Sequence, residues 1–222
     1  MKHLSSYIDH TLLKATATKS AIIQLCNEAK QYQFHAVCVN SCYVTLAKDQ
    51  LKNSEVSVCC VIGFPLGAMS TQAKVAETKQ ALKDGADEID MVLNIGLLKS
   101  KDFDAVWKDI EAVKKCMPHQ VLKVILETCY LEDLEIIKAS ELAVQSGADF
   151  LKTSTGFGTG GATFHYINLM KSVAIGNVKI KASGGIKDYQ TALEYINLGV
   201  ERLGTSSGIA IVTGEISTEN NY

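Results

Sequence analysis

The chain has 222 residues, of which 47% are hydrophobic and 21% are charged, and its formal net charge is −2. A near-neutral chain without a basic stretch lacks the electrostatic footprint of nucleic-acid binding and of binding to an anionic membrane surface. No apolar run reaches the roughly 18 residues that a membrane span needs, and the first residues lack the apolar core of a secretory signal. We therefore expect a soluble, cytoplasmic protein without nucleic-acid or membrane partners.

Short runs with the character of β-strands alternate along the chain with longer segments of helical periodicity. The predicted strands lie at residues 7–11, 35–40, 56–64, 88–94, 121–128, 150–155, 178–183 and 202–207. The predicted helices lie at residues 71–84, 102–116, 131–146 and 188–198. This alternation indicates a parallel sheet, and about eight strands is the number of a (β/α)8 TIM barrel. We expect a single α/β domain over residues 1–222, with a polar tail from about residue 214 to residue 222.

A weak internal repeat predicts the relative heights of three strands. The segments GADEIDMV, GADFLKTS and GVERLGTS each begin with a glycine that ends a predicted helix, and each continues into a predicted strand. Five residues after the glycine they carry Asp90, Lys152 and Gly204. If the three units are equivalent, these positions lie at similar heights near one mouth of the barrel. The alternative is a chance alignment of a common turn between helix and strand.

Ionisable residues stand in three strands where a doubly buried sheet favours Val, Ile and Leu, namely Asp90, Lys152 and Lys181. Two ammonium groups brought close in a partly dry barrel mouth disfavour each other's charge. This lowers the pKa of one of them, as a nucleophilic lysine requires. With Asp90 available for proton transfer, the three side chains predict Schiff-base chemistry on a carbonyl. The alternatives are lysine stems that cross apolar surface to reach solvent, and an aspartate that serves only in a salt bridge.

Glycine-rich turns follow the last two predicted strands, in the segments SGGIKD and GTSSG. TIM barrels commonly bind phosphate in these loops through backbone N–H groups and a short helix N-terminus. The expected phosphate donors are Gly184, Gly185, Gly204, Ser206 and Ser207. The alternative is that both turns are ordinary connections.

Neither a metal nor an organic cofactor is expected. The five histidines are scattered, and the seven cysteines form no zinc-site spacing. The segment GFGTGG at residues 156–161 lacks the acidic partner of a dinucleotide site. An odd number of cysteines, mostly inside apolar runs and without a C-x-x-C pair, indicates reduced thiols in a cytosolic protein.

Six segments in order along the chain carry a specific resemblance. They are YIDHTLLK, VIGFPLGA, EIDMVLN, LKTSTGFGTGGAT, IKASGGI and GTSSG. Together they resemble the deoxyribose-phosphate aldolase family over essentially the whole chain. The resemblance implies a TIM barrel and a cofactor-free class I aldolase, which reversibly cleaves 2-deoxy-D-ribose 5-phosphate to D-glyceraldehyde 3-phosphate and acetaldehyde. Its substrates would be small phosphosugars and aldehydes, and the resemblance suggests a homodimer.

The resemblance also assigns roles by motif. Lys152, in KTSTG, matches the Schiff-base lysine, and Asp90 and Lys181 match the pair that relays protons. The phosphate contacts fall on the five residues already named, with Gly156 beside them. In this scheme the iminium on Lys152 is the electron sink that lets the C–C bond break, and phosphate binding at the other end of the sugar fixes its geometry.

Some positions depart from the family's usual pattern. Ala15 follows Lys14 where relatives often have proline, and Ser41 likewise stands where relatives often have proline. Lys187 replaces an arginine and brings a point charge in place of a planar fork, which is expected to change phosphate affinity. In some relatives a C-terminal tyrosine, here Tyr222, reaches into the site. Cys38 lies where some relatives have an aldehyde-sensitive cysteine; the alternative is a small buried hydrophobic residue.

Two other functions remain open from the sequence. One is a different lysine-dependent aldolase or transaldolase of the same barrel class. The other is a phosphosugar-binding barrel without catalysis, which would have no need of a reactive lysine.

Overall fold

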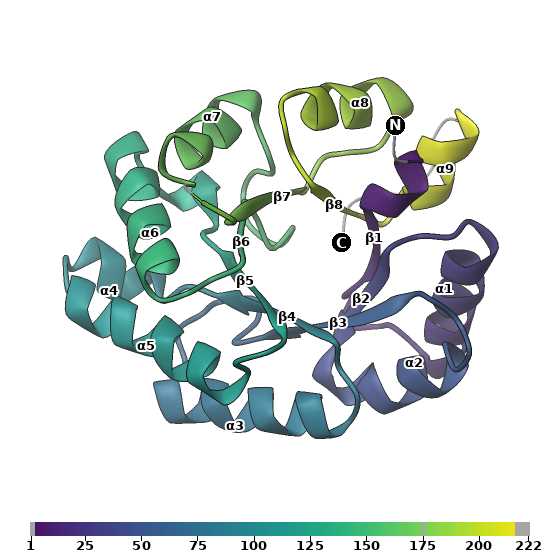
Figure 1. Ribbon diagram of the computed structural model, residues 1–222, viewed down its shortest axis with the longest axis horizontal. Helices are drawn as coiled ribbons and strands as arrows, with labels where there is room; N and C mark the ends of the chain where they lie inside the picture. Colours follow the sequence, from purple (N-terminus) through teal and green to yellow (C-terminus); the bar gives the residue numbers. More distant parts are fainter. Residues whose placement is uncertain (1–2, 175, 216–222) are drawn as a thin grey trace.

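The structure, a computed structural model, describes residues 3–174 and 176–215. Within these residues, eight parallel strands form a closed barrel in which each strand pairs with the next and β8 pairs with β1 (Figure 1). The strands are β1 (Ile8–Leu12), β2 (Ala36–Asn40), β3 (Ser57–Ile62), β4 (Glu88–Val92), β5 (Val121–Ile125), β6 (Phe150–Lys152), β7 (Lys179–Ser183) and β8 (Arg202–Thr205). Each strand falls on one of the predicted ranges, so the prediction of a (β/α)8 TIM barrel is confirmed.

The helices surround the barrel on its outside (Figure 1). They are α1 (Lys19–Gln31), α2 (Val44–Gln50), α3 (Thr71–Lys83), α4 (Ile95–Lys99), α5 (Phe103–Cys116), α6 (Asp133–Gln145), α7 (Phe164–Val173), α8 (Tyr189–Asn197) and α9 (Gly208–Thr213). The four predicted helices correspond to α3, α5, α6 and α8, and their ends differ from the prediction by at most two residues. The other helices were not predicted from the sequence.

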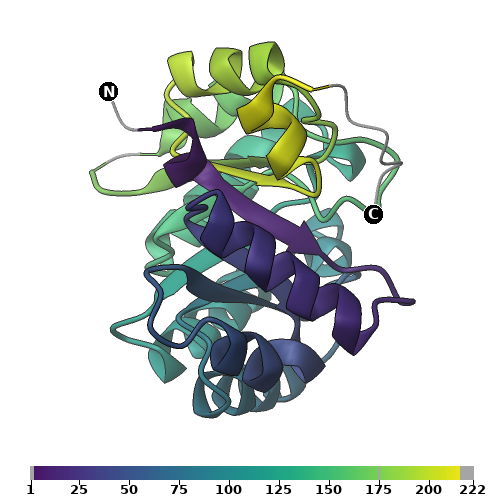
Figure 2. The ribbon, with the colours of Figure 1, turned by 90° about the vertical axis from the view of Figure 1, so that its right-hand side faces the viewer.

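Several helices pack directly against the strands of the barrel. Figure 2 shows α1 lying along the outside of β1, and α9 lies beside the short 3-10 helix Leu4–Tyr7. No helix in the part of the chain described here has the length and apolar character needed to cross a membrane. Of the predicted polar tail, Gly214 and Glu215 follow α9, and the remainder lies outside the described residues.

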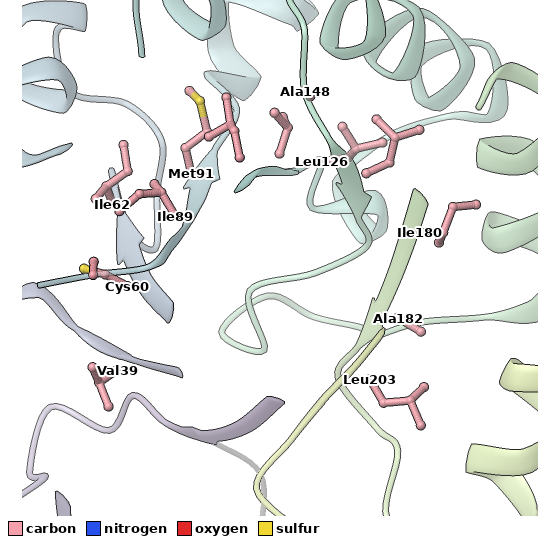
Figure 3. Close-up of a cluster of buried hydrophobic side chains, with 14 of the residues drawn as sticks. Val39, Cys60, Ile62, Ile89, Met91, Leu126, Ala148, Ile180, Ala182 and Leu203 are labelled. Carbon is pink, nitrogen blue, oxygen red and sulfur yellow. The ribbon is translucent and has the colours of Figure 1, made fainter. Parts of the chain in front are cut away.

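The apolar core lies between the outer face of the strands and the helices. Because side chains alternate along a strand, the residues that flank each inward-facing position point outward. Figure 3 shows side chains of this outer set, among them Cys60, Ile62, Met91, Ile180 and Leu203, all buried against the helix layer. Strands buried on both faces explain why their sequences do not alternate cleanly between polar and apolar residues.

Twelve of the inward-facing side chains form three successive layers of four, each built from alternate strands. Thr11, Val61, Ile125 and Ser183 continue the same alternation toward the carboxyl ends of their strands. The upper layer, nearer the carboxyl ends of the strands, holds Cys38, Asp90, Lys152 and Gly204; the middle layer Asp9, Cys59, Lys123 and Lys181; the lower layer Ala36, Glu88, Phe150 and Arg202. The register supports this arrangement, because each middle-layer residue pairs with one upper and one lower residue on its neighbouring strands. Lys181, for example, pairs with Lys152 on β6 and with Arg202 on β8.

The height predicted from the internal repeat agrees with this register. Asp90, Lys152 and Gly204 share the upper layer, and Lys181 lies one layer below them. The interior is unusual in its chemistry, because a barrel interior of this kind is ordinarily filled by bulky branched apolar side chains. Here most of the layered positions carry charged groups or thiols, and all of them are buried.

Candidate active site

The three side chains predicted to carry the chemistry meet at the carboxyl end of the barrel. Asp90 projects from β4, Lys152 is the last residue of β6, and Lys181 projects from β7. The Nζ atoms of Lys152 and Lys181 both donate to the same oxygen of Asp90, Oδ2, over 2.8 and 2.9 Å. The structure therefore brings together an acid and two amines that lie 62 and 91 residues apart in the sequence.

The second oxygen of Asp90 is also fully occupied. Its Oδ1 accepts from Lys123 Nζ at 2.8 Å and from Cys59 Sγ at 3.1 Å. Burial alone would raise the pKa of Asp90, but the charges of Lys123, Lys152 and Lys181 outweigh burial and hold that pKa well below its usual value. Asp90 is therefore a carboxylate at neutral pH, with a fixed position among four donors.

Lys181 is held between two carboxylates. Its Nζ donates to Asp9 Oδ2 at 2.5 Å as well as to Asp90. Burial would lower the pKa of Lys181, but the charges of Asp9 and Asp90 raise it well above its ordinary value. The lowering of pKa that the sequence predicted for one member of the lysine pair thus does not fall on Lys181. The prediction from the sequence did not include the charge of Asp9, which comes from the other end of the chain.

A ring of ion pairs below the three central side chains was not predicted. Arg202 donates to Asp9 Oδ1 at 2.9 Å and to both oxygens of Glu88 at 3.1 and 3.2 Å. Lys123 bridges Glu88 at 2.5 Å and Asp90 at 2.8 Å. These contacts support Asp90 and Lys181 from beneath. The signal in the sequence was a charged residue at the centre of a strand otherwise rich in Val, Ile and Leu, as at Lys123 in VLKVI.

Counting the ion pairs distinguishes Lys152 from the other basic groups of the three layers. Four basic side chains face three carboxylates there, Asp9, Glu88 and Asp90. Lys123, Lys181 and Arg202 each contact two of these carboxylates, whereas Lys152 contacts Asp90 alone. Lys152 is also the one nearest the end of its strand. Its amine is the one placed to leave the network and react with a carbonyl.

Glu127 anchors the loop that follows Lys152. This residue lies inside the predicted strand 121–128 but beyond the end of β5 at Ile125; it is buried and has a left-handed backbone with φ of 55°. Its Oε1 accepts from the backbone N–H of Thr155 at 3.1 Å, and its Oε2 accepts from the Thr155 hydroxyl. Burial raises the pKa of Glu127, and the Thr155 hydrogen bonds oppose the rise. A non-glycine residue in this strained conformation persists where the surroundings require it, often at a functional site.

Replacing Glu127 tests this anchoring. We expect Glu127→Ala to lower kcat about tenfold or more, because the loop loses two hydrogen bonds to a charged acceptor, each worth about 1.5–3 kcal/mol. Glu127→Gln keeps one acceptor oxygen and should recover part of the loss. Steady-state kinetics of both variants, with exposed Glu55→Ala as the control, check the result. Equal activity of Glu127→Ala and the parent chain would contradict it.

The predicted phosphate donors gather where β7 and β8 end. Gly185, Ser206 and Ser207 line one small hollow with Lys187, and Gly204 forms part of its wall. Gly184 and Gly185 both have positive φ angles, 85° and 83°, which favour glycine. The backbone N–H of Ser207 donates to Thr205 Oγ1 at 2.9 Å and so already has an acceptor.

The two glycine-rich loops are joined to each other. Gly161, in the loop after β6, lies so close to Gly184 that a Cβ on Gly161 would come within 2.3 Å of the Gly184 carbonyl oxygen. Ala162 N–H donates to the carbonyl oxygens of Ser183 and Gly184 at 3.0 and 3.1 Å. The loop that carries Lys152 and the loop that ends β7 are therefore one rigid surface. Gly156 belongs to the first of them, with φ of 89°, and is not among the residues that line the hollow.

Gly204 has a steric role in addition to its predicted one. A Cβ at this position would lie 3.0 Å from Lys181 Cε and 2.9 Å from Ser183 Cβ. Because Gly204 has no side chain, the Lys181 side chain has room to extend toward Asp90.

We expect Gly204→Ala to lower kcat about 10- to 100-fold, because a displacement of about 1 Å at a reacting group can cost that much. Kinetic assay of the variant, with Tm to show that the fold persists, provides the test. Gly96→Ala is a matched control, since its Cβ would meet only Asn94 Oδ1 at an ordinary 3.5 Å. An unchanged kcat for Gly204→Ala would show that Lys181 needs no such space.

The remaining predicted residues are less central. Cys38 is fully buried in the upper layer, beside Cys59. Tyr222 lies outside the described residues. Donor atoms of Cys38, Cys59 and Asp90, and of Asp9, Cys59 and Glu88, are close enough together to surround a metal ion. In both groups the carboxylates already accept from cationic side chains, whose charges oppose a dication.

Comparison with known proteins shows the family to which the chain belongs. Residues 4–212 match the family described as DeoC/LacD family aldolase. The deoxyribose-phosphate aldolase of Finegoldia magna is 57% identical over 211 residues, which is 95% of this chain and 99% of that protein. The solved structure of QR15, an aldolase, has a TM-score of 0.92 at 43% identity and covers 96% of each chain. The tetrameric deoxyribose phosphate aldolase of Aeropyrum pernix has a TM-score of 0.88 at 32% identity, covering 95% of this chain and 90% of that one. By sequence and by fold, this chain belongs to the DeoC/LacD family of aldolases.

Proposed function

We propose that this chain reversibly cleaves 2-deoxy-D-ribose 5-phosphate to D-glyceraldehyde 3-phosphate and acetaldehyde, through a Schiff base on Lys152. The observation that carries the proposal is the shared hydrogen bonding of Lys152 and Lys181 to one oxygen of Asp90, inside a closed barrel. A binding protein needs no buried amine of this kind. The substrate is supported by the relatives, which are named for deoxyribose phosphate.

The reaction begins at the amine with the fewest ion pairs. Lys152 Nζ, as the free amine, adds to C1 of the open-chain sugar, and loss of water gives an iminium ion. When the C3 hydroxyl loses its proton, the electron pair of the C2–C3 bond moves toward the iminium, and D-glyceraldehyde 3-phosphate leaves. The enamine that remains on Lys152 takes a proton at C2, and water releases acetaldehyde and the free lysine.

Asp90 and Lys181 are assigned to proton transfer in these steps. Lys181 stays an ammonium group because Asp9 and Asp90 flank it, so it holds a proton close to the reacting carbons. Asp90, a carboxylate in the free enzyme, stabilises the positive charge that develops when Lys152 becomes an iminium. Asp90 then takes the C3 hydroxyl proton by relay through Lys181, and the same proton is returned to C2 of the enamine, so that both groups regain their starting protonation states.

The phosphate of the substrate is assigned to the hollow at the ends of β7 and β8. Backbone N–H groups of Gly184, Gly185 and Gly204, with Ser206 and Ser207, are the proposed contacts, and Gly156 lies on the adjoining loop. Lys187 lines the hollow and adds a positive charge. Anchoring the sugar at its phosphate end holds C1 near Lys152 and makes the addition effectively intramolecular.

We also infer the cellular location and the oligomeric state of the protein. All seven cysteines are free, which supports a reducing, cytoplasmic location. We infer a homo-oligomer, for which a dimer is the prediction from the sequence, although the relative from Aeropyrum pernix is a tetramer. Light scattering of the purified chain distinguishes a dimer from a tetramer.

Borohydride trapping tests the assignment of Lys152. The chain is incubated with acetaldehyde, reduced, digested and mapped by mass spectrometry for the added ethyl group. A single adduct on Lys152 is the expected result. Lys179→Ala is the control, because Lys179 is on β7 but half-exposed and its ion pair is with Glu201, not with Asp9, Glu88 or Asp90. An adduct on Lys181 instead, or labelling of surface lysines alone, would overturn the proposal.

A further inference from the structure

Two cysteines lie side by side in the wall of the active site. Cys38 on β2 and Cys59 on β3 are register partners, and both face the barrel interior. Their Sγ atoms are within 4.8 Å of each other and of a carboxylate oxygen of Asp90. Neighbouring strands place register partners about 4.8 Å apart at Cα, which is inside the range that a disulfide spans.

The two thiols are chemically unequal. The neighbouring Cys59, and then the charges of Lys181 and Lys152, lower the pKa of Cys38 against the effect of burial. Burial and the nearby Asp90 raise the pKa of Cys59 well above its ordinary value. One sulfur of the pair is therefore disposed to react as a thiolate while the other retains its proton.

Cys59 also touches the groups assigned to catalysis. Its Sγ donates to Asp90 Oδ1 at 3.1 Å and accepts from Lys123 Nζ at 3.4 Å. Any change at the Cys59 sulfur therefore changes the surroundings of the carboxylate to which Lys152 and Lys181 are bound.

We propose that Cys38 and Cys59 form an oxidisable dithiol, through which hydrogen peroxide or an alkyl peroxide lowers the aldolase activity and a thiol reductant restores it. The access of peroxide and the effect on activity rest on the function proposed above, whereas the proximity of the two sulfur atoms does not. The site is a modification site in addition to the aldolase chemistry.

Hydrogen peroxide is the oxidant that accepts the two electrons released when the disulfide forms. The Cys38 thiolate attacks one peroxide oxygen, the O–O bond breaks, and hydroxide leaves, which gives a sulfenic acid on Cys38. The Cys59 sulfur then attacks the Cys38 sulfur, an S–S bond forms, and the S–O bond breaks. The second hydroxide takes the Cys59 proton and leaves as water. Overall, two thiols and one hydrogen peroxide give one disulfide and two water molecules, and two electrons pass from sulfur to oxygen.

Access follows from the substrate's own path. Cys38 shares the upper layer with Lys152, whose side chain is only 3% exposed and which an aldehyde must nevertheless reach. An opening that admits a sugar phosphate to Lys152 admits the smaller peroxide to the same layer. The same opening admits a small thiol reductant, which restores the two thiols by exchange through a mixed disulfide.

Loss of activity follows from the contact with Asp90. In the disulfide, Cys59 has no S–H to donate, so Asp90 Oδ1 keeps Lys123 as its donor and loses the thiol. A hydrogen bond to a charged group contributes enough that its loss lowers a rate about tenfold or more. We therefore expect kcat to fall by about this factor and to return after reduction.

The test treats the reduced full-length chain with graded hydrogen peroxide and follows two readouts, peptide mass mapping of cysteines and kcat. The expected result is a Cys38–Cys59 cross-link whose extent follows the loss of kcat, with both reversed by dithiothreitol. Cys42→Ala removes an exposed thiol and should behave like the parent chain. Cys59→Ala, compared with its own reduced form, should lose the cross-link and the reversal.

Three results would overturn the proposal. Oxidation confined to Cys42, Cys116 and Cys129 would show that peroxide does not reach the pair. A cross-link without loss of kcat would show that the pair is not coupled to Asp90. Loss of kcat of equal size and reversibility in Cys59→Ala would place the effect elsewhere. If the chain lacks aldolase activity altogether, the mass map still shows whether the cross-link forms.

Discussion

Lys152→Ala is expected to lower kcat/KM for 2-deoxy-D-ribose 5-phosphate by at least about 10⁴-fold, because removal of a covalent nucleophile eliminates the intermediate itself. Without the amine no iminium forms, and the electrons of the C2–C3 bond can move only into the neutral C1 carbonyl, which is a much weaker acceptor. Residual turnover by Asp90 and Lys181 alone would have to proceed through the enolate of acetaldehyde, which is less stable than the enamine. Steady-state assay of the variant, together with loss of the borohydride adduct, checks the result.

The fold should persist in this variant. Asp90 keeps Lys123 and Lys181 as cationic partners when Lys152 is absent. We expect a cooperative thermal transition and an unchanged circular dichroism spectrum. Lys179→Ala, which removes a half-exposed lysine from the neighbouring strand, should retain full activity. Activity of Lys152→Ala within tenfold of the parent chain would place the nucleophile on another side chain.

Asp90→Asn is expected to affect both catalysis and stability. The amide has the shape of the carboxylate but no charge, so three buried lysines lose a shared anion. Removing one partner from a buried ion pair destabilises a protein by about 3–5 kcal/mol. We expect a loss of that order in the free energy of unfolding, and a fall in kcat of about 10³-fold because Asp90 stabilises developing charge. Urea denaturation and kinetic assay measure the two effects.

The pH dependence of the stability loss distinguishes this cause from a general defect. The fold holds the pKa of Asp90 below its ordinary 3.8, so its contribution is fully present above that value and is lost as the pH falls through the lower, folded-state value. The stability difference between Asp90→Asn and the parent chain should therefore be large at pH 7 and shrink in strong acid. Asp104→Asn, at an exposed salt bridge with Lys108, should show little difference at either pH. A difference independent of pH would contradict the electrostatic explanation.

The sequence predicted the strands well because several contain a short apolar run, as in AVCV of β2 and VCCVI of β3. Helices with a clear apolar face, such as α5 and α8, were predicted for the same reason. Of the helices that were missed, α1 carries the usual signal, because its buried residues Ile22, Leu25, Cys26 and Ala29 follow helical spacing, whereas the others are short or mixed in composition. In α7, FHYINLMKSV mixes aromatic and β-branched residues, and in α9, GIAIVT begins with glycine and reads like a strand.

The site was predictable where a motif or a repeat marked it and not where it depends on barrel closure. Lys152 and Asp90 share a position in the repeat, and Lys181 lies in a recognisable motif. Asp9 and Lys181 are 172 residues apart. They meet because β1 pairs with β8, which lies beside β7, and this pairing closes the barrel. Whether a charged residue in a strand faces inward is decided by register, which a single sequence does not give.

The salt bridges of Asp9 join the first strand of the barrel to the last ones. Arg202 on β8 and Lys181 on β7 both depend on this single carboxylate from β1. If β1 detached while the rest of the barrel stayed folded, two cations would remain buried with one fewer partner each, which is energetically unfavourable. A partly opened barrel is therefore disfavoured relative to both the closed barrel and the unfolded chain. The same charges that organise the catalytic site make the unfolding of the barrel cooperative.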